Sequence, residues 1–125
     1  MKKKILLVDD EKNVTDILYK FLSRQGFKVF TAADAEGCLK IARQEVPDLI
    51  VLDVMMPGID GADLAHNLQE DEKTKNIPII FLTGAVSEEE VAKKGGQIGN
   101  RLFISKFSDI NEQINKIKKV LGIST

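Results

Sequence analysis

The sequence predicts an α/β fold in which five parallel strands form one sheet with helices on both faces. Short β-branched runs alternate five times with helix-length amphipathic segments, the pattern expected of a parallel sheet with crossover helices. Three of the runs, ILLV, LIVL and IPIIFL, are almost continuously hydrophobic, as strands buried on both faces must be. The 125 residues fit one domain, so we assign residues 1–125 to a single unit.

The strands are expected at the hydrophobic runs. In chain order they cover residues 4–8, 27–31, 49–53, 77–82 and 102–104. An apolar stripe at the helical period predicts the first helix, and Gly26 is expected to end it as a left-handed cap. The stripe consists of Val14, Ile17, Leu18, Phe21 and Leu22.

The later helices are expected to begin at residues that cap helix N-termini. These N-caps are Asp34, Asp60 and Ser87. The last helix has its own apolar stripe, made of Ile110, Ile114, Ile117 and Leu121. The fourth helix has the weakest signals, because Gly95 and Gly96 end it early, and we expect the segment 84–100 to be mobile.

Composition excludes several classes of protein. With 18 basic and 19 acidic side chains the formal net charge is -1, so no strong field attracts nucleic acid or an anionic membrane. The single cysteine, Cys38, forms no internal disulfide and is expected to pack as a small core residue. His66 has no partner at metal-binding spacing and is expected to be exposed. Because a lone cysteine forms no internal disulfide, a reducing cytoplasm is the expected compartment. No run is long enough for a signal-peptide core or a membrane span.

Polar side chains stand where the predicted strands end. They are Asp9 and Asp10 after the first strand, Asp53 at the end of the third, Thr83 after the fourth and Lys106 beyond the fifth. The carboxyl ends of parallel strands lie along one edge of the sheet, and ligands bind there at the point where strand order reverses. If the first and third strands are neighbours, the three carboxylates converge.

A cluster of three carboxylates predicts a divalent cation. Carboxylates that repel one another in a buried site take up protons unless a cation neutralises them. Mg²⁺ prefers oxygen ligands and commonly combines one or two carboxylates with the oxygens of a phosphate group. Asp10 and Asp53, helped by Asp9 and by the backbone carbonyl of Met55, would supply such ligands.

The same edge suits a phosphoryl group beside the metal. Lys106 offers a positive charge and three donors, and Thr83 offers a hydroxyl. Attack of the Asp53 carboxylate on phosphorus would give an aspartyl phosphate, and such a transfer needs mainly positioning and charge neutralisation. Taken alone, Asp10 is equally a helix N-cap, Lys106 a surface lysine and Phe103 a core ring. The prediction therefore depends on their convergence.

The motifs at these strand ends resemble the receiver domain of two-component response regulators. They are VDD after the first strand, LDVMMPGIDG after the third, FLTG at the fourth and FISK at the fifth. The resemblance covers essentially the whole chain and implies a flavodoxin-like, three-layer (βα)5 sandwich with strand order 2-1-3-4-5. It also implies a phospho-acceptor, a magnesium site, a lysine that contacts the phosphoryl group and a pair of switch residues. By position, Asp53 would be the phospho-acceptor, and Asp9, Asp10, Asp53 and the Met55 carbonyl would bind magnesium. Lys106 would contact the phosphoryl group, and Thr83 and Phe103 would be the switch residues.

The implied function is a signalling switch activated by phosphorylation of Asp53. The donor would be a sensor histidine kinase or a phosphotransfer protein, with Mg²⁺ as cofactor. The switch would change the face of the fourth helix, fifth strand and fifth helix, which would bind a target protein or an unseen output domain, or pair two copies weakly. We expect no enzymatic activity beyond the chain's own phosphoryl transfer and self-dephosphorylation. The self-dephosphorylation should be slow, because Met55 and Ala85 offer no polar side chain to guide an attacking water.

Two positions depart from the family pattern, and the first of them leaves an alternative open. Phe107 stands where the family usually has proline. A cis bond before phenylalanine would cost about 3 kcal/mol, so we expect a trans bond and an altered placement of Lys106. Gly84 stands where the family prefers alanine or another small residue, and glycine is expected to loosen the loop that moves with the switch. The alternative is a pseudo-receiver, a module that docks partners without phosphorylation and binds Mg²⁺ poorly.

Overall fold

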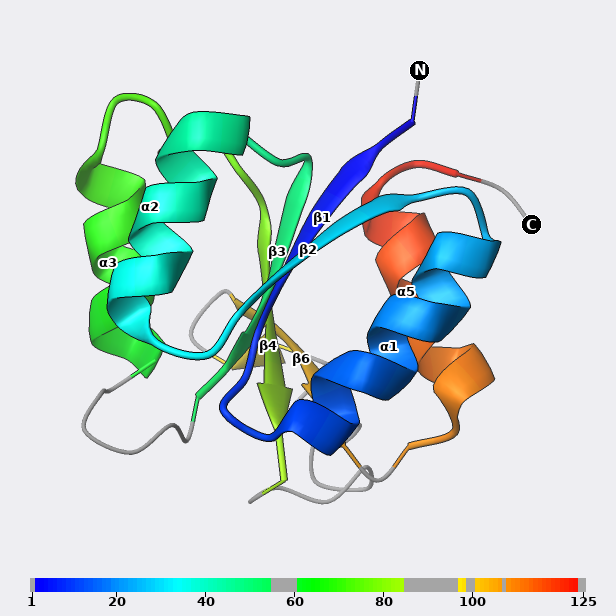
Figure 1. Ribbon diagram of the computed structural model, residues 1–125. Helices are drawn as coiled ribbons and strands as arrows, with labels where there is room; N and C mark the ends of the chain where they lie inside the picture. The colour runs from blue at the N-terminus through cyan, green and yellow to red at the C-terminus, as the bar shows by residue number, and fades with distance from the viewer. Residues whose placement is uncertain (1, 55–60, 85–96, 99–100, 107, 124–125) are drawn as a thin grey trace.

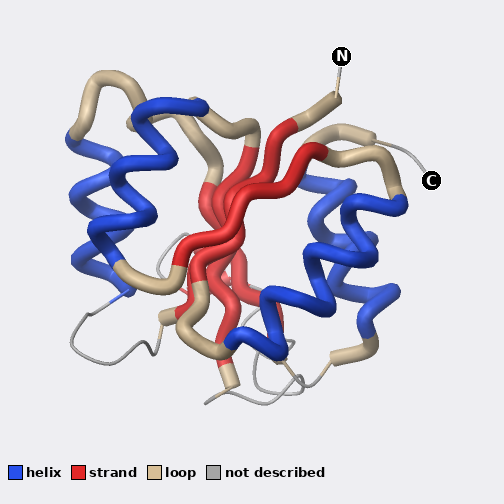
Figure 2. The backbone as a smooth tube through the Cα atoms, viewed as in Figure 1, coloured by secondary structure: helices blue, strands red, loops and turns tan. Residues whose placement is uncertain are grey.

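The computed structural model describes residues 2–54, 61–84, 97–98, 101–106 and 108–123. Within them a twisted sheet lies between two layers of helices (Figures 1 and 2). The strands are β1 Lys4–Val8, β2 Lys28–Ala32, β3 Leu49–Asp53, β4 Ile79–Thr83, β5 Gln97–Ile98 and β6 Arg101–Ser105. The helices are α1 Lys12–Arg24, α2 Ala35–Glu45, α3 Gly61–Glu70 and α5 Ile110–Val120. None of these described helices has the length and apolarity needed to cross a bilayer.

Five of the strands run parallel, in the order β2-β1-β3-β4-β6. Counted along the chain among the parallel strands, this order is 2-1-3-4-5, which confirms the predicted flavodoxin-like fold. Val8 of β1 lies opposite both Ala32 of β2 and Leu52 of β3. Because β2 and β3 lie on opposite sides of β1, the strand order reverses between β1 and β3. A ligand crevice is expected at that point.

Each face of the sheet has its own hydrophobic core. Leu6 and Cys38 belong to the core beneath α2 and α3, whereas Leu7 and Ile117 belong to the core beneath α1 and α5 (Figure 1). Neighbouring residues of β1 thus point to opposite faces, as the pleat requires. Cys38 is fully buried, and burial raises the pKa of its thiol to about 12. The expectation of a small core residue is confirmed.

The described helix ends agree with the predicted caps. Gly26 follows α1 with a φ of +95°, in the left-handed region that favours glycine. Asp34 begins α2, and its side chain accepts a hydrogen bond from the Gly37 N–H at 2.7 Å. The other two predicted N-caps, Asp60 and Ser87, lie outside the described residues.

Three strands have boundaries that differ from the prediction, and β2 and β4 each also end one residue later than expected. β2 begins one residue later than expected because the Phe27 N–H donates to a carbonyl in the last turn of α1. β4 begins two residues later, because Pro78 has no N–H to give to the ladder. β6 extends one residue beyond the prediction at each end.

His66 is exposed, as expected, and pairs with Glu70 at 3.0 Å.

The edge strand β5 was not predicted. It pairs antiparallel with β6, with Gln97 opposite Leu102. A signal for it exists, because Gly99 and Asn100 between two short runs form a dipeptide typical of tight hairpins. The expectation that 84–100 is mobile overlooked this signal. Most of that segment, including the predicted fourth helix, lies outside the described residues.

Candidate functional site

The strand ends bring three aspartates together where the strand order reverses. Carboxylate oxygens of Asp9, Asp10 and Asp53 lie within 4.8 Å of one another. Asp9 continues the β1 ladder, since its N–H donates to the Ala32 carbonyl at 3.1 Å, and Asp53 is the last residue of β3. Asp9 and Asp53 are almost fully buried, whereas Asp10 is exposed. The sheet therefore holds two of the three carboxylates on rigid backbone.

Lys106 reaches the same cluster from the end of β6. Its backbone N–H donates to the Thr83 carbonyl at 2.8 Å, which extends the pairing of β6 with β4. Its Nζ lies 2.7 Å from Glu11 Oε1, 3.0 Å from Asp9 Oδ2 and 3.2 Å from Asp53 Oδ2. One ammonium group therefore faces three carboxylates.

These contacts shift two pKa values in the cluster. Burial raises the pKa of Asp9 to about 6, although the Glu11 N–H and Lys106 act in the opposite direction. Burial alone would lower the pKa of Lys106, but the carboxylates of Glu11 and Asp9 outweigh it and raise that pKa above its ordinary value. Lys106 therefore stays protonated at neutral pH. Its single positive charge is shared among three carboxylates, so it does not fully neutralise Asp9.

The donor atoms of this cluster fit a magnesium ion. Asp9 Oδ1 accepts a hydrogen bond from the Glu11 N–H at 2.9 Å. Asp9 Oδ2 is buried and accepts none within the described residues, because its 3.0 Å contact with Lys106 Nζ is an ion pair without hydrogen-bond geometry. Buried acceptors without a donor are rare in folded proteins. A divalent cation would satisfy this oxygen, and a set of carboxylate oxygens suits Mg²⁺.

Thr83 and Phe103 lie on the same face of the sheet. Thr83 is fully buried at the end of β4, and Phe103 of β6 lies opposite Phe81, two residues before Thr83. Side chains two apart on a strand share a face. The rings of Phe81 and Phe103 have centroids 5.0 Å apart. Phe103 therefore packs toward α2 and α3, whereas Ile104 packs toward α5, which resolves what the sequence left open.

Two of the predicted features fall outside the described residues. They are the Met55 carbonyl and the peptide bond between Lys106 and Phe107. The placement of the Lys106 side chain is nevertheless described, and it points into the acidic cluster.

Two further residues at the site were not predicted. Glu11 contacts Lys106, and its only signal in the sequence is its place in the acidic run DDE. Gly61 begins α3 against the end of β3. A Cβ at Gly61 would lie 2.6 Å from the Cα of Val54, which is closer than two non-bonded carbon atoms approach each other. Gly61 ends the motif LDVMMPGIDG, but the motif by itself does not indicate this contact.

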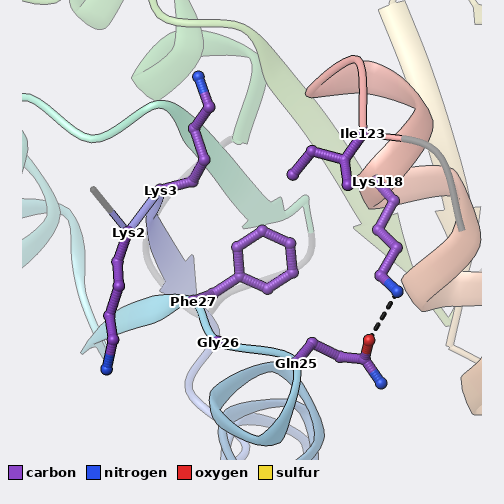
Figure 3. Close-up of a pocket in the computed structure, with 7 residues that line it drawn as sticks. All are labelled: Lys2, Lys3, Gln25, Gly26, Phe27, Lys118 and Ile123. Atoms are coloured by element: carbon purple, nitrogen blue, oxygen red, sulfur yellow. Dashed lines mark hydrogen bonds between the residues drawn. The ribbon is translucent and has the colours of Figure 1, made fainter.

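A hollow of about 480 Å³ lies at the opposite end of the sheet, at the amino ends of β1 and β2. Lysines line it, but Figure 3 shows Lys2 and Lys3 extending away from each other. Lys118 donates to Gln25 Oε1 at 2.6 Å. The ammonium groups do not converge, so the acidic edge is the better candidate site.

The sequence matches the response regulator receiver domain family over residues 5–118. The chain belongs to this family. The receiver domain is 40% identical over 121 residues to the alkaline phosphatase synthesis transcriptional regulatory protein PhoP of Bacillus subtilis (strain 168), covering 97% of this chain and 49% of that protein. It is 36% identical over 119 residues to the phosphate regulon transcriptional regulatory protein PhoB of Pseudomonas aeruginosa, covering 95% and 52%. It thus spans about half the length of these relatives.

Solved structures agree with this assignment. The receiver domain superposes on a response regulator from Desulfuromonas acetoxidans with a TM-score of 0.79 and 28% identity, covering 96% of this chain and 97% of the other. It superposes on the chemotaxis response regulator CheY4 of Vibrio cholerae with a TM-score of 0.81 and 27% identity, covering 96% and 99%. The fold is therefore shared over nearly the whole length of both structures.

Proposed function

We propose that this receiver domain is a signalling switch that accepts a phosphoryl group on Asp53. The donor is a histidine kinase or a phosphotransfer protein. The observation that carries the proposal is the buried Asp53 carboxylate, which lies 3.2 Å from Lys106 Nζ and within the acidic cluster. A nucleophile, a fixed cation and a cluster of oxygen ligands at one strand edge are what phosphoryl transfer to a carboxylate requires.

Each side chain has one role in the transfer. An Asp53 oxygen attacks phosphorus and forms a P–O bond. The P–N bond of the donor phosphohistidine breaks, and its electron pair returns to the imidazole. Lys106 neutralises charge on the phosphoryl oxygens, and the Thr83 hydroxyl donates a hydrogen bond to one of them. Asp9 and Asp10, with Asp53, would hold Mg²⁺, which when bound supplies further neutralisation of those oxygens.

The output of the switch is a change of surface near β6. Thr83 is drawn toward the phosphoryl group, and the space that it leaves admits the ring of Phe103, which lies on the same face of the sheet. The change is a population shift, because the phosphoryl group binds one packing better than the other. The named relatives are transcriptional regulators of about twice this length. An output domain or a separate target protein in the cytoplasm would therefore read the surface.

The experiment compares the wild-type chain with Asp53→Asn. Both proteins are incubated with Mg²⁺ and phosphoramidate, and their intact masses are measured. The wild type should gain one phosphoryl group and the variant none. Equal modification of both proteins would end the assignment. Absence of modification together with weak Mg²⁺ binding would instead support a pseudo-receiver that docks partners without phosphorylation.

A further inference from the structure

We propose that Glu11 is a positioning residue that holds the Lys106 ammonium at Asp53 when a divalent cation occupies the acidic cluster. The inference rests on the proposed phosphoryl transfer and adds a residue to it. Glu11 is not one of the three carboxylates that could bind the cation. It therefore remains free to bind the lysine when the others are engaged.

The contact joins two loops that are distant in the sequence. Glu11 Oε1 accepts a hydrogen bond from Lys106 Nζ at 2.7 Å across a separation of 95 residues. It is the shortest of the three contacts that Nζ makes with carboxylates. The Lys106 side chain is 11% exposed, whereas that of Glu11 is 61% exposed. Glu11 therefore holds the buried ammonium from the solvent side of the site.

Glu11 makes this contact in place of a local one. It occupies the N-cap position of α1, yet its side chain makes no capping hydrogen bond. The N-cap residues of α2 and α5, Asp34 and Asp109, each accept one from a backbone N–H. Helices favour aspartate, asparagine, serine or threonine at this position. A glutamate that reaches Lys106 instead indicates a role in the site rather than in the helix.

A bound cation would leave Glu11 as the remaining anchor of Lys106. The other two partners of Nζ, Asp9 and Asp53, belong to the acidic cluster. A divalent cation would take up their charge and repel the ammonium. Gly84 has no Cβ to pack against the lysine stem, although a Cβ there would make an ordinary 3.5 Å contact with Lys106 Cδ. The hydrogen bond to Glu11 then keeps the tip of the lysine in place.

The first test is the rate of phosphorylation by phosphoramidate at saturating Mg²⁺. Glu11→Gln should lower the rate constant at saturating donor about threefold to tenfold, because an exposed charged hydrogen bond contributes modestly to positioning. Asp16→Asn removes the same charge from an exposed position on α1 and should leave the rate unchanged. A faster Glu11→Gln protein would show that Glu11 competes with the phosphoryl group for Lys106, which overturns the proposal.

The variant Glu11→Asp separates positioning from helix stability. Aspartate is a good N-cap but is one methylene shorter than glutamate. We expect the melting temperature to stay level or rise while the phosphorylation rate falls. A rate that follows stability in both Glu11 variants would indicate a merely structural role.

The effect of Glu11 should pass through Lys106. In a Lys106→Gln background, Glu11→Gln should cause no further loss of rate. An equal fold-loss with and without the lysine would contradict the proposal.

A further measurement does not depend on phosphorylation. The Lys106 ammonium protons are followed by ¹⁵N NMR in Mg²⁺, where the wild type should protect them from exchange and Glu11→Gln should not. Equal protection in both proteins overturns the positioning role even if Asp53 is phosphorylated. The opposite result would be protection that depends on Glu11 in a protein that phosphoramidate does not modify. It would refute the proposed function but support the positioning of Lys106 by Glu11.

Discussion

The Nζ atom of Lys106 lies 3.2 Å from Oδ2 of Asp53, although the two residues are 53 positions apart. The sheet creates this proximity, because β3 and β6 both pair with β4 and therefore end at the same edge. Asp53 is buried, and Asp9 beside it is also buried. The lysine is thus the cation that stabilises two buried carboxylates in the metal-free protein.

Lys106→Gln should lower the free energy of unfolding at neutral pH by about 1–3 kcal/mol in metal-free buffer, because it leaves buried carboxylates without a counter-charge. Mg²⁺ should restore much of that loss by binding the folded state alone. Urea unfolding with and without Mg²⁺ measures both effects. A loss of stability that Mg²⁺ does not reduce would contradict this account.

Asp9→Asn should stabilise the metal-free protein at neutral pH. The folded-state pKa of Asp9 is raised to about 6, mainly by burial, against about 4 in an unfolded chain. The stabilisation from the proton on Asp9 is fully present below about pH 4 and is lost as pH rises through the folded pKa. The variant should therefore gain about 1 kcal/mol or more over the wild type at neutral pH.

The pH dependence is the check on this prediction. Urea unfolding of both proteins is measured from about pH 4 to neutral pH, where the wild type should lose stability relative to the variant. Parallel stability curves over this range would show that Asp9 is not the group responsible. In Mg²⁺ the order should reverse, because only the wild type keeps the buried oxygen that the cation would bind.

Gly61→Ala should be strongly destabilising, because the new Cβ would lie 2.6 Å from the backbone Cα of Val54. The start of α3 must then move away from the end of β3, at a cost of about 2 kcal/mol or more. Gly84→Ala is the matched control, since its Cβ would make an ordinary 3.5 Å contact with Lys106 Cδ. Thermal unfolding of the two variants compares them. Equal melting temperatures would show that the helix start adjusts freely.

Val46 carries backbone strain at the end of α2. Its φ of +43° lies in the left-handed region, which disfavours a β-branched side chain, and the residue is 49% exposed. Val46→Asn should raise the free energy of unfolding by about 1 kcal/mol, because asparagine adopts this conformation more readily. Val46→Ala removes the β-branch but keeps a Cβ and gains no local hydrogen bond, so it should raise stability less than asparagine does. A larger gain from alanine than from asparagine would count against strain as the cause.

The sheet could be predicted from the sequence because burial on both faces leaves its mark on the strands themselves. The runs ILLV and LIVL are typical of central strands, and a carboxylate such as Asp53 at the end of such a run, before Pro57 and Gly58, has no helix to cap. Asp53 could therefore be favoured from its local pattern, whereas Asp9 was predicted from the convergence of strand ends at one edge of the sheet. The predicted strand starts were wrong where the backbone N–H bonds elsewhere, as at Phe27, or is missing, as at Pro78.

The contacts that complete the site could not be predicted in the same way. Glu11 contacts a lysine 95 positions away, and Gly61 is required by the close approach of the backbone at the end of β3. Neither relationship produces a period in the sequence, and the motif LDVMMPGIDG, which ends at Gly61, does not show which backbone that residue meets. The orientation of Phe103 could be predicted only in part. Alternation along the strand puts Phe103 and Ile104 on opposite faces of the sheet, but only the packing against Phe81 shows which face Phe103 occupies.

The most direct test of the central claim locates the phosphoryl group on the chain. The protein is treated with Mg²⁺ and phosphoramidate and then with sodium borohydride, which reduces an acyl phosphate to homoserine, and its peptides are mapped by mass spectrometry. We predict homoserine at position 53, dependent on both Mg²⁺ and donor. Homoserine at position 9 or 10 instead, or an unchanged Asp53 in a protein that has gained phosphate, would contradict the account.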